Sequence, residues 1–523
     1  MATLAIQQPE VRPERGDLSA WLAVAAGTLG AFMALLDTSI VSASLPTIQG
    51  EIGATPAEGT WVSTAYLAAE VIVIPLTVWL ERLFGLRRLL VMATVLFTMF
   101  SILCGMSTTL VAIIIGRLGQ GLTGGILIPT AITVVARRLP PSQQAVGIAI
   151  FGFSALFGPI VGPVIGGWIT ESYSWHYAFF INLPVGMALV PLLLVSLPSE
   201  ATDFGALRDA DWLGIGGIII GLGALTVVLE EGHREDWFES ALILRLTLLT
   251  LIGFAMLALG QFRARVPVIK LSLLRVPILA GTIAMMSVLG AMQFAQLFLV
   301  PQFLAAVAGY NSLQAGQIML ATGLSCALVV PLYPPFLIHL HPRLVVGAGV
   351  LVTAASSFAA STMTTDTTGT SFLLTLALMG VGTALTSMPL QQGSIAAVSM
   401  ADAGAASALF MVSRNLGGSI GLAVMASYQD VRLEFHHWRL HESIAANALA
   451  VQQQLAEGML RFGGGPEGLA AASRALDGQV LRQALVMSFN DMFFALGVLT
   501  MAILPLCLLL RRFDPGSADV PMH

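Results

Sequence analysis

Residues 19–44 read SAWLAVAAGTLGAFMALLDTSIVSAS, an apolar run in which Asp37 is the only charged side chain. A helix needs about 20 mostly apolar residues to cross the hydrocarbon core of a membrane. The chain has fourteen such runs, this one included, at residues 19–44, 59–80, 88–107, 109–136, 143–168, 177–197, 212–230, 241–261, 278–300, 312–336, 343–362, 371–395, 405–428 and 489–510. The sequence therefore predicts an all-α membrane protein with 14 transmembrane helices.

The composition of the 523 residues agrees with this prediction. Hydrophobic residues make up 56% and charged residues 10% of the chain, whereas a soluble globular protein carries about 25% charged residues. So few charges do not cover a water-facing surface, and a net charge of −5 provides no basic footprint for nucleic acid. An ordinary cytosolic enzyme, a disordered chain and a nucleic-acid-binding protein are excluded.

Nucleotide, metal and cofactor sites receive little support. The chain has one lysine, Lys270, and it does not lie in a phosphate-binding loop of the form G-x-x-x-x-G-K-[ST]. The three cysteines, Cys104, Cys326 and Cys507, are far apart in apolar runs, which is typical of packing residues. We therefore expect no cofactor and no ATPase site within the chain.

The distribution of positive charge predicts the orientation. With both termini in the cytoplasm, the inner segments hold fifteen of the 24 Lys and Arg residues, and the short outer loops hold only Arg234. Positive residues are retained on the cytoplasmic side, so both termini are predicted to be cytoplasmic. The first run is interpreted as a retained span, and the alternative is a signal peptide cleaved near Ser42-Ala43-Ser44.

The spans group as six, two and six. We predict a cytoplasmic N-terminal tail at residues 1–18, an N-terminal six-helix bundle at 19–200, a linker with two extra transmembrane helices at 201–277, a C-terminal six-helix bundle at 278–512 and a cytoplasmic tail at 513–523. Two six-helix halves around a central cavity are a known transporter architecture. A long periplasmic loop at 429–488 precedes the last span, and Gly463-Gly464-Gly465-Pro466 divides it into two helix-like pieces.

An ordered set of motifs resembles the major facilitator superfamily, in particular its fourteen-helix drug:proton antiporter branch of the EmrB/QacA type, closer to EmrB. The motifs are LDTSIV at 36–41, RLGQG at 117–121, GPIVGPVIGG at 158–167, FFINLP at 179–184, PQFL at 301–304 and RNLGGSIG at 414–421. The loop after the second span departs from the family pattern G-x-x-x-D-R-x-G-R-[KR], because it reads VWLERLFGLR at 78–87. This loop either pairs through Glu81 as a cytoplasmic gate or only supplies positive charge.

Three charged residues lie at similar depth in the first four spans, namely Asp37, Glu70 and Arg117. A charge inside a bilayer costs about 2.5–3.5 kcal/mol on insertion scales and so indicates function. Burial favours the protonated form of a carboxylate, whereas a nearby arginine favours the charged form. We predict that Asp37 and Glu70 carry the exchanged proton and that Arg117 tunes them. The depth favours Glu70 as the carrier and the resemblance favours Asp37, while a static buried ion pair is the alternative.

The fifth span carries small residues at intervals of four, which places them on one helix face. By resemblance it holds the antiporter motif, with Gly158, Pro159, Gly162, Pro163, Gly166 and Gly167. We predict a kinked helix that seals the transport path against leak. Close helix packing through small residues is an interpretation compatible with this one.

A soft, apolar substrate cavity with sparse polar contacts is predicted, because Met and aromatic side chains adapt to varied ligands. Its candidate lining residues are Tyr66, Phe151, Phe157, Asn182, Gln293, Phe294, Gln296 and Arg414. For Arg414 the alternative is an anchor to helix carbonyls.

Two further patterns resemble catalytic or metal motifs. Residues 417–421, GGSIG, match G-x-S-x-G, but they lie in an apolar run instead of the strand-to-helix turn that a nucleophile requires. His437 and His441 are four residues apart, as a metal-binding pair would be. The sequence shows no third ligand cluster, so a solvated helix face and no metal site are predicted.

Together these patterns predict a secondary transporter and not an enzyme. The specific prediction is a proton-coupled multidrug efflux antiporter that exports hydrophobic or amphipathic toxic compounds across the bacterial inner membrane. The alternative is an exporter of a single metabolite such as a fatty acid or aromatic acid, which Arg414 facing the cavity would favour. A membrane enzyme or receptor would need a clustered polar set at one interface, which the sequence does not show. The resemblance implies docking of residues 429–488 to a periplasmic membrane-fusion adaptor and an outer-membrane channel, and a cap over the outer opening is the other interpretation.

Overall fold

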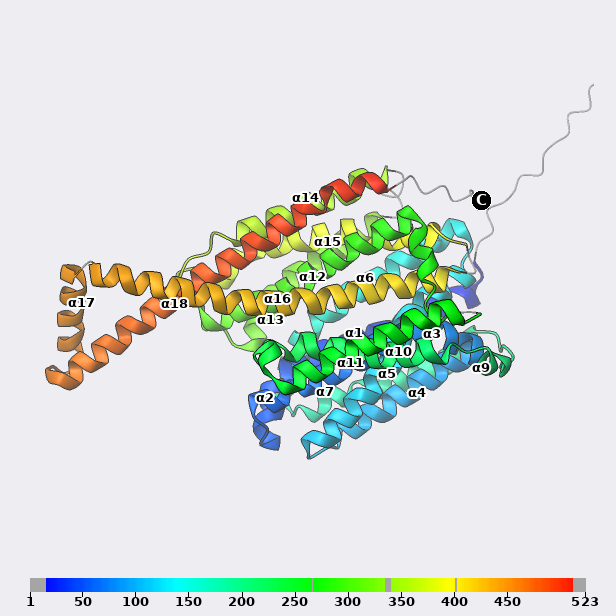
Figure 1. The fold of residues 1–523 in the computed structure, drawn as a ribbon, viewed down its shortest axis with the longest axis horizontal. Coiled ribbons are helices and arrows are strands. Elements are labelled where there is room, and N and C mark those ends of the chain that lie inside the picture. Colours follow the sequence, from blue (N-terminus) through cyan, green and yellow to red (C-terminus); the bar gives the residue numbers. More distant parts are fainter. Residues whose placement is uncertain (1–15, 266, 334–339, 400–401, 447, 511–523) are drawn as a thin grey trace, which may run out of the picture.

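Long helices run side by side along the longest axis of the computed structural model (Figure 1). The structure describes residues 16–265, 267–333, 340–399, 402–446 and 448–510. Every regular element in these ranges is a helix. The predicted C-terminal tail at 513–523 and most of the predicted N-terminal tail lie outside the described residues.

The predicted spans are found in the predicted order. They correspond to α1 (Leu18–Ile52), α3 (Trp61–Phe84), α4 (Leu86–Gly105), α5 (Leu110–Arg138), α6 (Pro141–Ser172), α7 (His176–Phe180) together with α8 (Asn182–Ser196), α10 (Trp212–Glu231), α11 (Ala241–Arg263), α12 (Pro277–Ala306), α13 (Ser312–Val329), α14 (Pro342–Ala360), α15 (Phe372–Ala396), α16 (Ala403–Ala446) and α18 (Gly465–Ala502). Within the described ranges, 13 helices are long and apolar enough to cross a membrane, and α6, bent by 41° within its length, makes 14. The all-α fold is therefore confirmed.

Short helices connect or extend these spans. They are α2 (Pro56–Gly59), α9 (Gly205–Arg208), α17 (Ala448–Arg461) and the 3-10 turns η1 (Trp237–Glu239), η2 (Leu271–Arg275), η3 (Val330–Leu332), η5 (Gly369–Ser371) and η7 (Leu504–Leu509). The ends of the helices follow local chemistry. For α1, the Asp17 side chain accepts a hydrogen bond from the backbone N–H of Ala20, and Gly53 ends the helix with a φ of 69°.

Glycines let several helix pairs approach closely. The extra helices α10 and α11 meet at Gly217, Gly221 and Gly253, where an added Cβ would contact backbone atoms of the opposite helix. A Cβ at Gly417 of α16 would likewise contact the backbone of Ser287 in α12. Close backbone approach gives van der Waals contact between helices in a membrane, where no hydrophobic effect drives their association.

Helices from the two halves of the chain also meet. Helix α3 packs on α16, and α6 packs on α13. Helix α10 lies against both α3 and α16. The extra span α10 is thus attached where the first and second halves of the chain are in contact, and α11 packs on α10. The predicted domain divisions themselves remain predictions.

The segment predicted as a long loop is mostly helix. Helix α16 has 44 residues and α18 has 38, and both continue past the rest of the bundle, with α17 lying across their far ends (Figure 1). Gly463 and Gly464 have φ values of 95° and 74° between α17 and α18, which confirms the predicted break. The second piece is not separate, however, because no proline follows Pro466 within α18 and the helix continues into the last span.

Candidate functional site

Asp37 and Arg117 form a buried ion pair between α1 and α5. Asp37 is 0% exposed, and its Oδ2 lies 2.5 Å from Nη1 of Arg117. Gln120 and Asn182 donate hydrogen bonds to Oδ1 of Asp37 at 2.9 and 2.6 Å. Both carboxylate oxygens therefore have hydrogen-bond donors, as a buried charge requires.

The guanidinium of Arg117 is held on its other sides as well. Its Nε donates to the carbonyl oxygen of Val62 at 3.1 Å, and Nη1 donates to Gln120 at 3.1 Å. The ring of Tyr66 lies 4.2 Å from the guanidinium carbon, and the Tyr66 hydroxyl donates to the carbonyl of Ala34. Paired and hydrogen-bonded in this way, the two charges have the geometry that the static alternative requires.

Glu70 has a different environment. It is 5% exposed on α3, and its Oε1 accepts a hydrogen bond from Nδ2 of Asn415 on α16 at 3.2 Å. No ion pair to Glu70 occurs among the residues that the structure describes. The structure thus brings Asp37 and Arg117 together as predicted, but it directs Glu70 to the second half of the chain.

Arg414 precedes Asn415 on α16. Its guanidinium carbon lies 5.8 Å from the ring centroid of Phe294 on α12, and it is within electrostatic range of Glu70. In the described part of the chain its guanidinium donates no hydrogen bond to a helix carbonyl. The described geometry therefore gives no support to the carbonyl-anchor interpretation.

Two carboxylates of α10 were missed by the sequence analysis. Glu231 is fully buried, accepts hydrogen bonds from Thr60 and from Thr64, the latter at 2.7 Å, and pairs with Arg234. Glu230 is half-buried and accepts a hydrogen bond from Ser419 of α16 at 2.8 Å. The sequence contained a signal for them, because Glu230 and Glu231 are adjacent acids at the end of a run with no other charge. The predicted span ended at residue 230, between the two acids, so they were not considered as a pair.

A line of polar groups on α16 runs outward from Glu70. Asn415, Ser419 and Ser427 recur at multiples of four residues and so share one helix face. Ser427 accepts a hydrogen bond from Nε1 of Trp237 at 3.0 Å. Further out, Nε2 of His233 lies 3.3 Å from Asp430. This face therefore presents polar side chains to α3, α10 and η1 along α16 from Asn415 toward the C-terminal part of the helix.

The loop that departs from the family pattern carries an ion pair. Glu81, near the C-terminal end of α3, lies 2.5 Å from Arg137 at the C-terminal end of α5, and Arg137 is also 3.8 Å from Glu200. All three border a cavity of about 410 Å³ that is also lined by Gly404 of α16. The pairing of Glu81 left open by the sequence is thus present, while a gating role stays a prediction.

The glycines of α6 pack on α1. An added Cβ at Gly158 would lie 3.4 Å from Leu35 Cβ, and one at Gly166 would lie 2.7 Å from the carbonyl oxygen of Ile40. Gly162 is also closely covered by α1, whereas Gly167 faces Leu313 of α13. The 41° bend lies between the segments 142–159 and 161–172, at the first of the two prolines, Pro159 and Pro163. The predicted kink is present, and the sealing function stays a prediction.

The predicted lining residues lie in several different surroundings. Tyr66 and Asn182 belong to the Asp37 network, and Phe151 lies in the main hydrophobic core. The remaining contacts are Phe157 stacked on Phe153, Gln293 donating to Ser387 at 3.2 Å, Gln296 donating to Ser357 at 2.7 Å, and Phe294 beside Arg414. None of the eight lines the cavity of 410 Å³ or a second one of about 230 Å³ beside Lys270.

The fold has many membrane spans, and charged groups are buried where helices of the two halves meet. These two features together define a membrane transporter. The chain belongs to the Major Facilitator Superfamily, whose family model matches residues 27–422. It is 30% identical over 475 residues to the multidrug export protein EmrB of Escherichia coli (strain K12), with 89% of this chain and 90% of that protein covered. The spans and such relatives make it a multi-pass protein of the bacterial inner membrane.

Other relatives are named as resistance proteins. Identity is 27% over 486 residues to the colistin resistance protein EmrB of Acinetobacter baumannii, with 92% of this chain and 94% of that protein covered. Identity is 27% over 499 residues to the fatty acid resistance protein FarB of Neisseria gonorrhoeae, with 94% of this chain and 96% of that protein covered.

Solved structures share the fold. The proton:xylose symporter XylE superposes with a TM-score of 0.56 at 15% identity, with 93% of this chain and 96% of that chain covered. The human organic anion transporter MFSD10 has a TM-score of 0.55 at 16% identity, with 92% and 99% covered.

Proposed function

We propose that this protein is a proton-coupled antiporter that exports hydrophobic or amphipathic toxic compounds. Relatives named for multidrug export and colistin resistance support the efflux of varied compounds. The observation that carries the proton coupling is the contact of Glu70 with Asn415, a buried carboxylate bound by a neutral side chain of the other half. The membrane potential adds about 2.3 kcal/mol per charge per 100 mV as driving force.

Glu70 suits proton exchange better than Asp37. Asp37 pairs with Arg117 and accepts hydrogen bonds from two amides, so its protonation would leave the buried Arg117 charge without its partner. Glu70 has one amide donor and no ion-pair partner among the described residues, so its protonation breaks no salt bridge, although the Arg414 charge lies nearby. A hydrogen bond to a charged carboxylate is roughly twice as strong as one between neutral groups. Protonation of Glu70 therefore weakens the contact between α3 and α16, and loss of the proton restores it.

Glu230 extends the same arrangement toward the outer side. Its partner Ser419 lies one helical turn beyond Asn415, which is about 6 Å along α16. In the proposed step a proton from the outer side binds Glu230, then leaves it as a carboxylate and binds Glu70. The titratable and charged groups facing this route are Glu231 on α10, His233 and Arg234 directly after it, Arg414 and Asp430 on α16, and Arg117 on α5.

A second candidate is an exporter of a single carboxylate-bearing metabolite. Arg414 favours it, because its guanidinium faces Phe294 with no hydrogen-bond acceptor in the described ranges. An amphipathic anion offers both a carboxylate for the arginine and an apolar body for the ring. The name of the FarB relative, which refers to fatty acid resistance, points the same way.

Transport by purified protein in sealed vesicles tests the coupling. Under an imposed pH gradient we expect drug export by the unchanged protein, none with Glu70→Gln, and a residual pH-dependent rate with Asp37→Asn. Glu171→Gln is the matched control, because Glu171 is an exposed carboxylate at the end of α6. Equal export with and without the gradient would show that the protein is not an antiporter.

The outer extension of α16, α17 and α18 is proposed to dock a periplasmic adaptor that leads to an outer-membrane channel. Its length beyond the bundle supports this, because the spans alone need no such projection (Figure 1). Removal of residues 440–480 should abolish resistance in cells but leave insertion and vesicle transport intact. Unchanged resistance would refute docking, and loss of vesicle transport as well would indicate a cap over the opening.

A further inference from the structure

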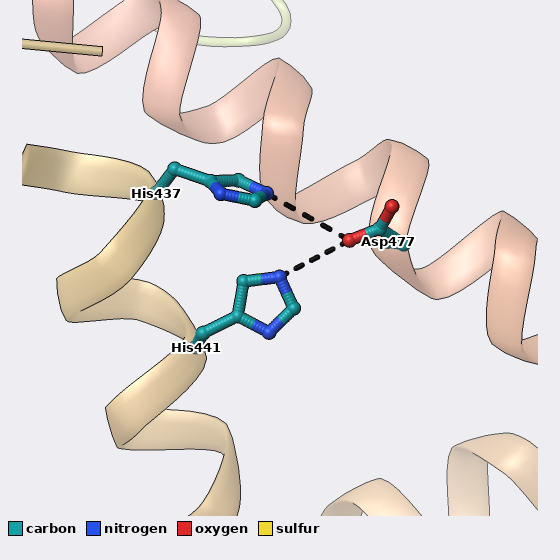
Figure 2. Close-up of side chains that lie close together, drawn as sticks. All are labelled: His437, His441 and Asp477. Carbon is teal, nitrogen blue, oxygen red and sulfur yellow. Dashed lines mark hydrogen bonds and ion pairs between the residues drawn. The ribbon is translucent and has the colours of Figure 1, made fainter. Parts of the chain in front are cut away.

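We propose that His437, His441 and Asp477 form a Zn²⁺ site on the outer extension, where it joins α16 to α18. Both imidazoles of α16 point toward one carboxylate oxygen of Asp477 on α18 (Figure 2). The Nε2 atom of His441 lies 3.1 Å from Oδ1 of Asp477, and that of His437 lies 3.7 Å from the same atom. The possible ligand atoms of the three residues all lie within 4.8 Å of one another.

These separations fit tetrahedral zinc. With zinc bonded to nitrogen and oxygen at about 2.0–2.1 Å, the ligand atoms of a tetrahedral site are about 3.3 Å apart. The two nitrogen-to-oxygen distances, 3.1 and 3.7 Å, lie on either side of that value. The third separation, between the two imidazole nitrogens, is no more than 4.8 Å, so binding would need only the side chains to rotate toward a shared ion. Two imidazoles and one carboxylate also match the ligand preference of zinc, which accepts nitrogen and oxygen donors.

The fold creates this site from residues that are distant in sequence. His437 and His441 share one face of α16 because they are four residues apart. Asp477 comes 36 residues after His441, and α17 with the glycine turn brings α18 back beside α16. No third ligand is evident in the sequence near His437 and His441, whereas the structure places Asp477 beside them.

The surroundings suit a site with an open fourth position. The side chains of His437, His441 and Asp477 are 36%, 49% and 60% exposed, so a water molecule or an external ligand has access. The neighbouring His436 is engaged elsewhere, because its Nε2 lies 2.6 Å from Asp491, which also pairs with Arg432. That second cluster already holds α16 to α18 nearer the bundle, and zinc would add a second link further out.

Zinc binding to the full-length protein tests the proposal. The protein is purified through a histidine-free tag, stripped with a chelator, and titrated with zinc chloride while bound metal and heat are measured. We expect about one zinc ion per chain, and affinity lower by at least about tenfold for His441→Gln and for Asp477→Asn. Glu457→Gln is the control, because it removes one exposed carboxylate of the same extension on α17 and should bind as the unchanged protein does.

The Asp477→Asn variant distinguishes a zinc site from a plain hydrogen bond between Asp477 and the histidines. Asparagine still accepts a hydrogen bond from an imidazole, so a purely structural contact survives this change, whereas a metal ligand is lost. Zinc should raise the unfolding temperature of the unchanged protein and not that of the variant. Undiminished zinc affinity in Asp477→Asn would mean that the histidine pair alone binds and would overturn the proposal. Absence of zinc uptake by the unchanged protein would overturn it as well.

Discussion

Asn415 of α16 donates a hydrogen bond to Glu70 of α3 across 3.2 Å, which joins two residues 345 positions apart. Glu81 and Glu231, the other buried carboxylates of α3 and α10, each pair with an arginine, as Asp37 of α1 does. Glu70 and Glu230 instead contact Asn415 and Ser419 of α16. Among these carboxylates of α1, α3 and α10, the two with neutral partners are thus those that contact α16.

Replacing Glu70 by Gln should abolish the dependence of transport on the pH gradient. The amide keeps the size of the side chain and its contact with Asn415, but it takes up no proton. Drug binding measured by equilibrium titration should persist while gradient-driven export falls to the background of protein-free vesicles. Pronounced export that still follows the gradient would exclude Glu70 as the proton carrier.

Replacing Glu230 by Gln should slow proton entry without removing coupling. If protons reach Glu70 by way of Glu230, the export rate should decrease several-fold while the direction of the pH dependence stays the same. Glu239→Gln is the matched control, because Glu239 is an exposed carboxylate beyond the end of α10. Identical rates for both variants would remove Glu230 from the proton route.

Breaking the buried ion pair should destabilise the protein. Removing one partner of such a pair costs about 3–5 kcal/mol, because the other charge is left uncompensated. We expect Arg117→Ala to give little folded protein by size-exclusion chromatography. The double change Asp37→Asn with Arg117→Gln should recover part of the yield, since neither charge remains. A yield of the single variant equal to that of the unchanged protein would contradict the assignment of a stabilising pair.

Adding one methyl group at Gly166 should separate α6 from α1. Its Cβ would lie 2.7 Å from the carbonyl oxygen of Ile40, and a backbone atom cannot rotate away. Overpacking of this kind costs about 1–3 kcal/mol. Gly166→Ala should lower the unfolding temperature, whereas Gly478→Ala, with open space at the added Cβ, should leave it unchanged or slightly higher. A proton leak in vesicles that hold stable Gly166→Ala protein would support the sealing function.

The pair of Lys270 and Asp402 should make a pH-dependent contribution to stability. Asp402 directly precedes α16, and its side chain lies 2.5 Å from that of Lys270. The hydrogen bond from Lys270 lowers the pKa of Asp402 from its usual 3.8. A carboxyl group with a lowered pKa in the folded state stabilises the fold above its ordinary pKa, and this contribution is lost as the pH falls through the lower value. Lys270→Gln should therefore lower the unfolding temperature slightly at pH 7, and the difference should shrink below pH 3.8. A difference that grows in acid would contradict this sign.

Much of the fold follows from short stretches of the chain. Runs of about 20 apolar residues predict the spans, because burial in lipid requires each backbone polar group to be satisfied within its own helix. The break at Gly463 and Gly464 is equally local, since both residues adopt positive φ. The continuation of α16 and α18 beyond the bundle was not evident, because polar amphipathic helix and loop are similar in hydropathy.

The buried charged residues could be found from the sequence, whereas their contact partners could not. A charge in an apolar run identifies Asp37, Glu70, Arg117 and Arg414 without any structure, because such a charge is costly in a membrane. The sequence by itself therefore determined the spans and most of the charged groups within them. Only the tertiary structure decided that Glu70 faces Asn415, that Glu230 faces Ser419 and that Asp477 joins His437 and His441. Contacts between distant helices depend on how whole helix faces pack against one another, and local hydropathy carries no information about that packing.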